Sequence, residues 1–260
     1  MVKIKKNKTI ISYFVFLLTF FIFIACQSQK DIVYEVNAKQ ININEKAETI
    51  NAIDSFITPY RNHINDDLNH VLAYNPIDQD KSKGEWETNI GNLFAKATFE
   101  LSNPIFQKRE NKNIDGCILN HGGIRAVIPK GNVTTRTAYE IMPFENSIIV
   151  VALKGSEILN LANYILKEKK PHPLYGITIF TNEDFSVVKK VEIHNKIVEN
   201  DKIYHIATSD YLANGGDNMT FLKNSSNKYD LDYKLRSLFI DYFTKVDTLP
   251  NLTTKHVIIE

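Results

Sequence analysis

The sequence predicts an α+β domain in which mixed β-sheets carry flanking helices. Segments with apolar residues at three- and four-residue steps alternate irregularly with short runs that are apolar or alternate in polarity. These are the periodicities of amphipathic helices and of strands. The strand-like runs of the second half follow one another as hairpins do. Such irregular interleaving favours the α+β class, with a mixed α/β arrangement as the alternative.

Two helices and one strand are predicted in the first part of the domain. Apolar residues recur at helical spacing over residues 50–64, where Pro59 favours a kink or an early end. Residues 70–74 are a short strand candidate, and residues 75–84 form a polar loop. A second helix has one apolar face and is expected to stop at Pro104. That face consists of Ile90, Leu93, Phe94, Ala97 and Leu101.

The remaining elements are shorter and are distributed over the rest of the chain. The sequence contains no internal repeat or low-complexity block. Helices are predicted near residues 137–141 and at residues 155–166 and 233–243. Strands are predicted at residues 115–119, 147–153, 175–181, 189–194 and 203–208.

The N-terminus has the pattern of an export signal. Four lysines precede an uncharged, strongly apolar run that ends at Cys26. Small Ala25 before the cysteine and polar residues after it resemble the lipobox of bacterial lipoproteins, in which the cysteine is lipidated and becomes the new N-terminus. We therefore expect a signal peptide at residues 1–25, a lipid on Cys26, a tether at residues 26–44 and a domain at residues 45–260. An uncleaved signal-anchor helix is the alternative.

Either arrangement places the protein in a bacterial cell envelope, tethered to a membrane and facing the periplasm or the cell exterior. Removal of residues 1–25 takes away four lysines and no acidic residue, so the formal net charge falls from +1 to −3. A mildly acidic chain argues against nucleic acid as a partner. Beside a lipidated Cys26, Cys117 is the one cysteine left, so an apolar core without disulfides must hold the fold.

Three loops have a composition suited to ligand binding. Residues 120–125 read NHGGIR, residues 142–146 read MPFEN, and residues 209–217 read SDYLANGGD. Each adjoins an apolar strand, and loops on a rigid scaffold commonly carry binding groups. Together they supply two aromatic rings, an acid, amides and a guanidinium. Rings can stack on a base, an acid can accept hydrogen bonds from ribose, and arginine can pair with phosphate, so the set suits a nucleoside phosphate.

Taken singly, each of these residues has an ordinary structural explanation. Phe144 can be a core anchor, Tyr211 a packed ring, and Arg125 a surface or salt-bridge residue. Residues 215–217 can be a simple turn, and His121 is expected to be a solvated loop histidine. The functional prediction therefore depends on the order and spacing of the three loops together.

That order resembles the C-terminal domain of the 5'-nucleotidase family, which includes periplasmic UDP-sugar hydrolases and animal ecto-5'-nucleotidases. The resemblance runs from about Glu45 to the C-terminus and is sharpest between Asp115 and Asp217. It implies the fold of that family's C-terminal domain. In the family this domain holds the nucleotide, and a separate N-terminal metallophosphoesterase domain, which is not found in this sequence, cuts the phosphate.

The resemblance also implies a set of ligand-binding residues. The family's NGGGIR, PFGN and NFLANGGDG motifs correspond to residues 120–125, 143–146 and 210–218. The expected site residues are Asn120 for the base, Gly123 in the turn, Arg125 for the phosphate, Phe144 and Tyr211 as the two stacking rings, Asn146 as a polar contact and Asp217 as the ribose acceptor.

Two positions depart from the family pattern. Glu145 replaces the usual glycine of the PFGN motif and adds a negative charge close to the expected base site. Asn218 replaces the glycine after the aspartate, and asparagine tolerates the left-handed conformation that such a turn needs. Family members also use one or two arginines before the second helix for phosphate, where this chain offers Lys81 and Lys83. We therefore expect weaker phosphate binding.

The sequence lacks the pattern of a catalytic metal centre. Hydrolysis of the family's kind uses a two-metal cluster of Asp, His and Asn ligands. The seven histidines are scattered, and none lies beside a carboxylate at ligand spacing. We expect no catalytic residue, no metal site and no cofactor in this chain, with divalent metals only in a partner.

Three hypotheses about function follow. The first is a split enzyme of nucleotide catabolism, in which this chain recognises a nucleoside monophosphate and a separately encoded, exported metallophosphoesterase docks onto it. The second is a stand-alone lipoprotein that binds nucleosides or nucleotides, and the third is a degenerate scaffold. An exposed apolar patch large enough for a stable partner would favour the first.

Overall fold

The computed structural model describes residues 8–24, 38–44 and 49–260. The chain divides into two compact units, residues 1–51 and 52–260. The first contains helix α1 (Lys8–Ile24). Within the described residues, no helix combines the length and the apolar character that crossing a membrane requires. Cys26 lies outside these residues, so the signal peptide, the tether and the lipid anchor stay predictions.

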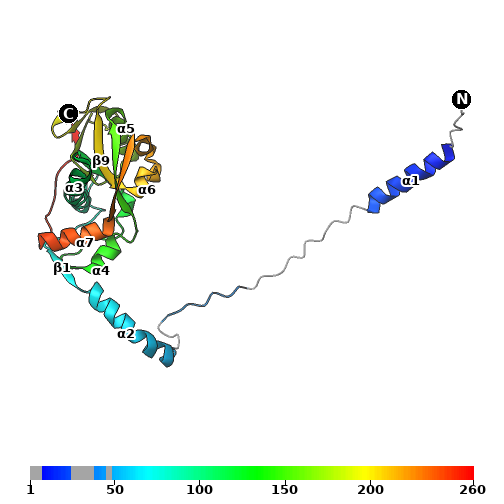
Figure 1. Cartoon of the computed structure of the whole chain (residues 1–260), viewed down its shortest axis with the longest axis horizontal. Coiled ribbons are helices and arrows are strands. Elements are labelled where there is room, and N and C mark those ends of the chain that lie inside the picture. The colour runs from blue at the N-terminus through cyan, green and yellow to red at the C-terminus, as the bar shows by residue number, and fades with distance from the viewer. Residues whose placement is uncertain (1–7, 25–37, 45–48) are drawn as a thin grey trace. The chain divides into compact units, whose positions relative to one another are not determined.

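The second unit is built around a mixed sheet of five strands in the order β10-β4-β9-β2-β5, of which β9 is labelled in Figure 1. Strand β4 is antiparallel to both neighbours, whereas β2 and β9 run parallel. A four-stranded sheet has the order β11-β6-β7-β8, and β1 pairs with β3. The strands are β1 (Val71–Asn75), β2 (Gly116–Ile118), β3 (Gly131–Thr134), β4 (Ser147–Lys154), β5 (Leu174–Tyr175), β6 (Ile177–Thr181), β7 (Val188–Ile193), β8 (Lys196–Ile197), β9 (Ile203–Ser209), β10 (Asn227–Lys234) and β11 (Val257–Ile259).

Helices pack on both faces of the five-stranded sheet. Ile148 and Val150 of β4 share an apolar cluster with α3 and α7, whereas Ile149 and Val151 share another with α5. Successive residues of a strand point to opposite faces, so β4 lies between two cores. The predicted α+β class with mixed sheets and flanking helices is confirmed. The helices are α2 (Asn51–Leu68), α3 (Asn89–Glu110), α4 (Thr135–Ile141), α5 (Gly155–Glu168), α6 (Asp210–Ala213) and α7 (Leu235–Val246), with 3-10 turns η1 (His121–Gly123), η2 (Gly216–Asn218) and η3 (Thr220–Asn224).

The expectation that Pro104 stops the second helix is wrong. Helix α3 continues through this exposed proline to Glu110. Phe106, two residues later, is fully buried. Burial of such a side chain contributes about 1.5–3 kcal/mol, which is comparable to the cost of about 3 kcal/mol for a proline inside a helix. The helix ends instead at Asn111, whose left-handed backbone, with φ of 54°, caps it.

Two strand predictions also need correction. The run at residues 175–181 is two strands, because Gly176 turns the chain at φ +74° from the five-stranded sheet into the four-stranded one. A Cβ atom at this glycine would lie 2.7 Å from the carbonyl oxygen of Asp115. Strand β10 was not predicted, because its sequence NKYDLDYK is polar and only Leu231 is buried. The helix predicted at residues 233–243 includes the last two residues of β10, whereas helix α7 begins at Leu235.

Candidate functional site

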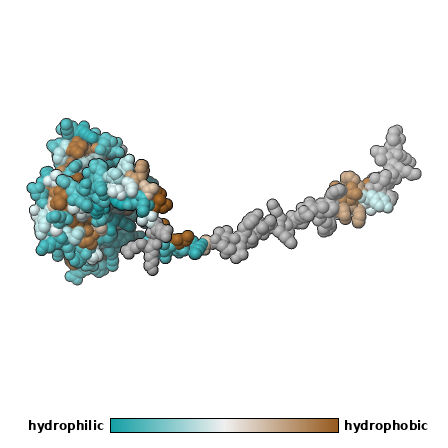
Figure 2. Space-filling model, turned by 90° about the horizontal axis from the view of Figure 1, so that it is seen from below, coloured by the Kyte–Doolittle hydropathy of each residue, from teal (hydrophilic) through white to brown (hydrophobic). Residues whose placement is uncertain are grey.

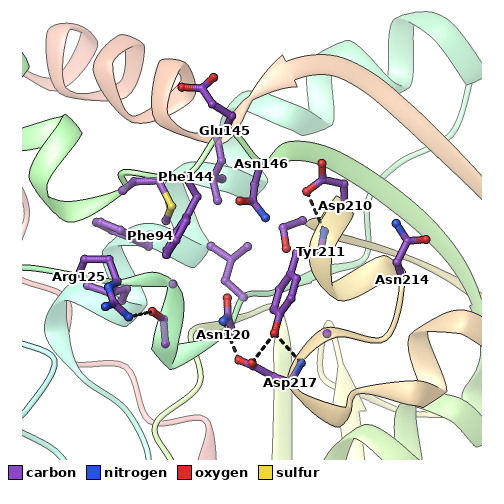
Figure 3. Close-up of a pocket in the computed structure, with 18 of the residues that line it drawn as sticks. Phe94, Asn120, Arg125, Phe144, Glu145, Asn146, Asp210, Tyr211, Asn214 and Asp217 are labelled. Atoms are coloured by element: carbon purple, nitrogen blue, oxygen red, sulfur yellow. Dashed lines mark hydrogen bonds between the residues drawn. The ribbon is translucent and has the colours of Figure 1, made fainter. Parts of the chain in front are cut away.

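The three predicted loops meet at one end of the strands of the five-stranded sheet. NHGGIR follows β2, and SDYLANGGD begins at the end of β9. These two strands are parallel, so both loops leave the sheet at the same end of the strands. Strand β4 is antiparallel to β9, so the MPFEN loop that precedes it lies there too. The loops line a cavity of about 1000 Å³, to which α3 adds Phe94 and α7 adds Leu235 (Figure 3).

The NHGGIR loop is a 3-10 turn that folds over its own first side chain. The Gly123 N–H donates to the Asn120 carbonyl oxygen over 3.0 Å. A Cβ atom at position 123 would lie 2.7 Å from Asn120 Oδ1, so glycine leaves the room that this amide occupies. Asn120 Nδ2 donates to Asp217 Oδ2 over 2.7 Å. The turn is thereby tied to the SDYLANGGD loop, 97 residues away in sequence.

Tyr211 and Asp217 hold each other in place on the SDYLANGGD loop. The Tyr211 hydroxyl donates to Asp217 Oδ1 over 2.8 Å, and the Asp217 N–H donates back to that hydroxyl over 3.1 Å. The Tyr164 hydroxyl donates to the Asp217 carbonyl oxygen over 2.6 Å. Gly216 lies against the Tyr211 ring, where a Cβ atom would overlap the ring carbons. Tyr211 therefore rests on a glycine and remains 47% exposed.

Phe144 is the second aromatic ring of the cavity and comes from the MPFEN loop. It is 42% exposed, and the Cζ atom of Arg125 lies 5.8 Å from the centroid of its ring. Figure 3 shows Phe144 and Tyr211 projecting into the same cavity from different elements. Exposed aromatic rings that flank a cavity offer flat faces on which a planar ligand can stack.

The MPFEN loop is held from behind by Arg236 of helix α7. The Arg236 guanidinium is buried, contacts the Glu145 carboxylate, and donates to the carbonyl oxygens of Met142 (3.2 Å) and Phe144 (3.4 Å). Lys234 adds a 2.9 Å hydrogen bond to the Glu145 carbonyl oxygen. The charge that Glu145 brings to this loop is therefore paired with Arg236, which differs from the expectation of an added negative charge at the base site.

The cavity brings together every residue predicted to bind a ligand. Phe94, Leu235 and Arg236 were not predicted, because each comes from a helix whose contact with the loops depends on tertiary packing. All the expected site residues line the cavity, namely Asn120, Gly123, Arg125, Phe144, Asn146, Tyr211 and Asp217.

The sequence profile described as "5'-nucleotidase, C-terminal domain" matches residues 70–224, which is more than half of the chain. The chain belongs to this family. Among curated relatives, this 5'-nucleotidase C-terminal domain is 26% identical over 226 residues to the trifunctional nucleotide phosphoesterase protein YfkN of Bacillus subtilis, covering 81% of this chain and 15% of that protein. It is 27% identical over 182 residues to the 5'-nucleotidase of Mus musculus, covering 62% of this chain and 31% of that protein.

Solved structures agree with this assignment of the fold. The 5'-nucleotidase precursor from Thermus thermophilus has a TM-score of 0.65 at 24% identity, over 79% of this chain and 42% of that one. The NAD nucleotidase of Haemophilus influenzae has a TM-score of 0.61 at 17% identity, over 81% of this chain and 41% of that one. The chain spans about a third or less of the length of the curated relatives it matches.

Two cationic side chains lie at the NHGGIR turn of this 5'-nucleotidase C-terminal domain. Arg125 is exposed, and its hydrogen bond to the Gly122 carbonyl oxygen is long, at 3.4 Å. Lys81 Nζ donates to the Ile124 carbonyl oxygen over 2.6 Å, from a position 43 residues earlier in the chain. Lys83, by contrast, pairs loosely with Asp80 at 3.9 Å. The sequence could not distinguish these two lysines, whereas the fold brings Lys81 to the turn.

Two histidines lie together at the NHGGIR turn, His121 within the turn and His172 against it. The His121 N–H donates to His172 Nδ1 over 3.3 Å, and His172 is buried. Burial, helped by the neighbouring His121, lowers the pKa of His172 to about 4. Burial and then Lys81 lower the pKa of His121. His121 is only partly accessible and its Nδ1 is enclosed, so the expectation of a solvated loop histidine is wrong.

The described part of the chain contains no group of three or more His, Cys, Asp or Glu side chains that could hold a metal ion. The cavity is lined instead by two aromatic rings, a fixed carboxylate and amide, and the Arg125 guanidinium, and Lys81 binds the Ile124 carbonyl oxygen of the adjoining NHGGIR turn. These groups can bind and orient a flat, polar, anionic molecule.

Proposed function

We propose that this domain binds a nucleoside monophosphate and is the recognition part of a 5'-nucleotidase-type hydrolase of nucleotide catabolism. One observation carries the proposal. The Phe144 and Tyr211 rings, the hydrogen-bonded pair of Asn120 and Asp217, and the Arg125 guanidinium all line a single cavity. The family assignment supports it, because both curated relatives described above are named as enzymes of nucleotide phosphoesters.

The base would lie between the two rings. Asn120 donates through Nδ2 to Asp217, which orients the amide and leaves Oδ1 to accept from an amino group of the base. Each Asp217 oxygen already accepts one hydrogen bond from the protein, and a carboxylate oxygen can accept a second, here from a ribose hydroxyl. Stacking tolerates many bases, so base preference would depend on Asn120 and its neighbours.

The phosphate would lie at the NHGGIR turn. Arg125 is exposed beside Phe144, and its planar fork of donors matches phosphate oxygens. Lys81 is held at the same turn by the Ile124 carbonyl oxygen and adds a second positive charge. Lys81 would therefore take the place of the upstream arginines that the family resemblance leads one to expect.

Hydrolysis itself would need a second component. We propose that a separately encoded, exported metallophosphoesterase supplies the divalent metals and the attacking water, and that lipidation of Cys26 tethers this chain to the bacterial envelope. The apolar residues exposed on helix α2 favour this reading over a stand-alone binding protein.

Calorimetric titration of residues 27–260 with AMP and with adenosine, in EDTA, tests the binding function. We expect both ligands to bind without metal, and AMP to bind more tightly than adenosine. Lys81→Met should weaken AMP binding alone, and Lys83→Met, in the same loop, is the matched control that should change neither. Failure of the unmodified protein to bind either ligand would overturn the proposal.

A further inference from the structure

Helix α2 has an apolar face that the body of the protein does not cover. Not one of its residues is buried. Five large apolar side chains recur at three- and four-residue steps, and Phe56 at their centre is 71% exposed. The rest of the surface seen in Figure 2 is mostly hydrophilic, with small separate hydrophobic areas. We name this face the α2 stripe, and it consists of Ile53, Phe56, Ile57, Tyr60 and Ile64.

The α2 stripe is the kind of surface that binds a partner. Helices in proteins gain most of their stability from packing an apolar face, and no described residue of the second unit packs on this one. Anchors at steps of three, four and seven residues are how an amphipathic helix seats in the apolar groove of another protein.

The body contacts α2 at the C-terminal end of the helix. Arg136 of helix α4 donates to Asn65 Oδ1 over 3.0 Å and to Asn69 Oδ1 over 3.3 Å. The Thr135 N–H donates to the His70 carbonyl oxygen over 3.1 Å. The helix therefore leaves the body at a defined point, and a protein seated on its apolar face would be held there.

Helix α4 connects this point to the ligand cavity. Arg136, near its start, holds α2, whereas the Tyr139 ring lies 4.2 Å from the Cζ atom of Arg236, which holds the MPFEN loop. At 1.5 Å per residue, the seven residues of α4 span only about 10 Å. The C-terminal end of α2, where the stripe ends at Ile64, is thus attached near the loop that carries Phe144.

The charges of α2 argue against a membrane surface as the occupant. Asp54, Asp66 and Asp67 outnumber the one arginine of the helix, Arg61, which is already paired with Asp54 at 2.8 Å. Helices that lie on anionic membranes are instead rich in lysine and arginine. A protein partner fits the stripe better.

The position of α2 in the sequence indicates which protein would bind the α2 stripe. The family match begins at residue 70, two residues after α2 ends, and the family is that of a C-terminal domain. The curated relatives extend well beyond the third or less of their length that this chain matches. Helix α2 therefore lies directly before the residues that match the family's C-terminal domain, on the side where the remainder of such a protein precedes it.

We propose that the α2 stripe is the docking surface for the metallophosphoesterase that completes the hydrolase. This inference rests on the proposed function. An apolar groove on the partner would take Phe56 and its neighbours, and the attachment of α2 at α4 would tether the seated partner to the domain that carries the ligand cavity.

Site-specific photocrosslinking in the native envelope tests the docking surface. The full chain would carry a benzophenone amino acid in place of Phe56, and in place of Ile197, a 61% exposed residue of β8, as the control. We expect the position-56 adduct alone to contain a protein with metallophosphoesterase sequence motifs. A dimer of this chain, a lipid adduct, or no adduct at position 56 would each overturn the proposal.

Substitution separates failure of docking from failure of ligand binding. With the crosslinked partner purified and kept below saturation, Phe56→Asp should reduce AMP hydrolysis by tenfold or more, whereas Ile197→Asp should not. Phe56 is exposed, so the thermal midpoint and AMP binding in EDTA should stay unchanged in both variants. Loss of hydrolysis with intact AMP binding supports docking through α2, and equal hydrolysis by the two variants contradicts it. Absence of AMP binding in the unmodified chain would instead contradict the proposed function.

Discussion

The Glu145 carboxylate contacts the Arg236 guanidinium and thereby fastens the loop that carries Phe144 to helix α7. The two partners differ greatly in exposure, since the Glu145 side chain is 69% exposed and that of Arg236 is 11% exposed. Arg236 also donates hydrogen bonds to the carbonyl oxygens of Met142 and Phe144. We therefore expect Arg236 to contribute more than Glu145 to keeping this loop ordered.

Replacement of Arg236 should destabilise the protein more than replacement of Glu145. Arg236→Met leaves two carbonyl oxygens of a part-buried loop without their donor, and each such loss costs about 1–3 kcal/mol. Glu145→Gln keeps an acceptor for Arg236 and should cost less than about 1 kcal/mol, because the Glu145 side chain is 69% exposed and its charge is well solvated. Urea unfolding of both variants measures the difference, and equal losses would show that the ion pair itself stabilises the loop.

Arg125→Ala should separate phosphate recognition from base recognition. Loss of a charged hydrogen bond should weaken AMP binding by about 1.5–3 kcal/mol. Adenosine has no phosphate and should bind almost unchanged. Calorimetry with both ligands checks this, with Arg125→Lys as the variant that keeps the charge. Equal losses for AMP and adenosine would mean that Arg125 supports the Phe144 ring, against which it lies.

Tyr211→Phe should impair ribose recognition and preserve stacking. The variant keeps the ring on Gly216 but removes the hydroxyl that donates to Asp217 Oδ1 and accepts from the Asp217 N–H. We expect a loss of about 1 kcal/mol for adenosine and little change for adenine, which has no ribose. Tyr211→Leu, which removes the ring, should weaken both ligands in the same titrations. An equal effect of Tyr211→Phe on adenosine and adenine would argue against Asp217 as the ribose acceptor.

Acid should destabilise the fold through His172. Its pKa falls from 6.5 to about 4 on burial, so between these values the unfolded chain binds a proton that the folded chain does not. The free energy of unfolding must then decrease as the pH falls through this window, by on the order of 2–3 kcal/mol for this group. The lowered pKa values of His121, His205 and His256 act in the same direction.

Substitution of His172 isolates this contribution. His172→Asn keeps an acceptor for the His121 N–H but does not titrate. As the pH falls from 7 to 4, the free energy of unfolding in urea should therefore decrease less for this variant than for the unmodified protein. His63→Asn, at an exposed histidine of α2, is the matched control. Parallel pH profiles for all three proteins would exclude His172 as the source.

Much of this fold could be predicted because its core elements have strong local patterns. Strand β4 is an almost unbroken apolar run, and the apolar residues of helix α5 recur at helical spacing. The prediction failed where tertiary contacts outweigh local preference. Burial of Phe106 extends α3 past Pro104, and pairing with β4 makes a strand of the polar β10.

The loops of the site were predictable for a different reason, since they combine glycines with chemically distinctive side chains in a fixed order. Their helical supports were not. Arg236 lies 91 residues from the Glu145 side chain it contacts, and Lys81 lies 43 residues from the Ile124 carbonyl oxygen it binds. No periodicity or motif in a single sequence indicates such pairs, so only the fold reveals them.

Each of the three loops of the cavity adjoins a different strand of one sheet. Because the loops lie outside the paired segments of these strands, a substitution or insertion in one loop need not alter the register of β2, β4 or β9. Glu145 in the MPFEN loop illustrates this independence. The charge it adds is paired with Arg236, and β4 still begins at Ser147, directly after the loop. The chemistry of the loops can thus change among related proteins while the strand pairing of the sheet is kept.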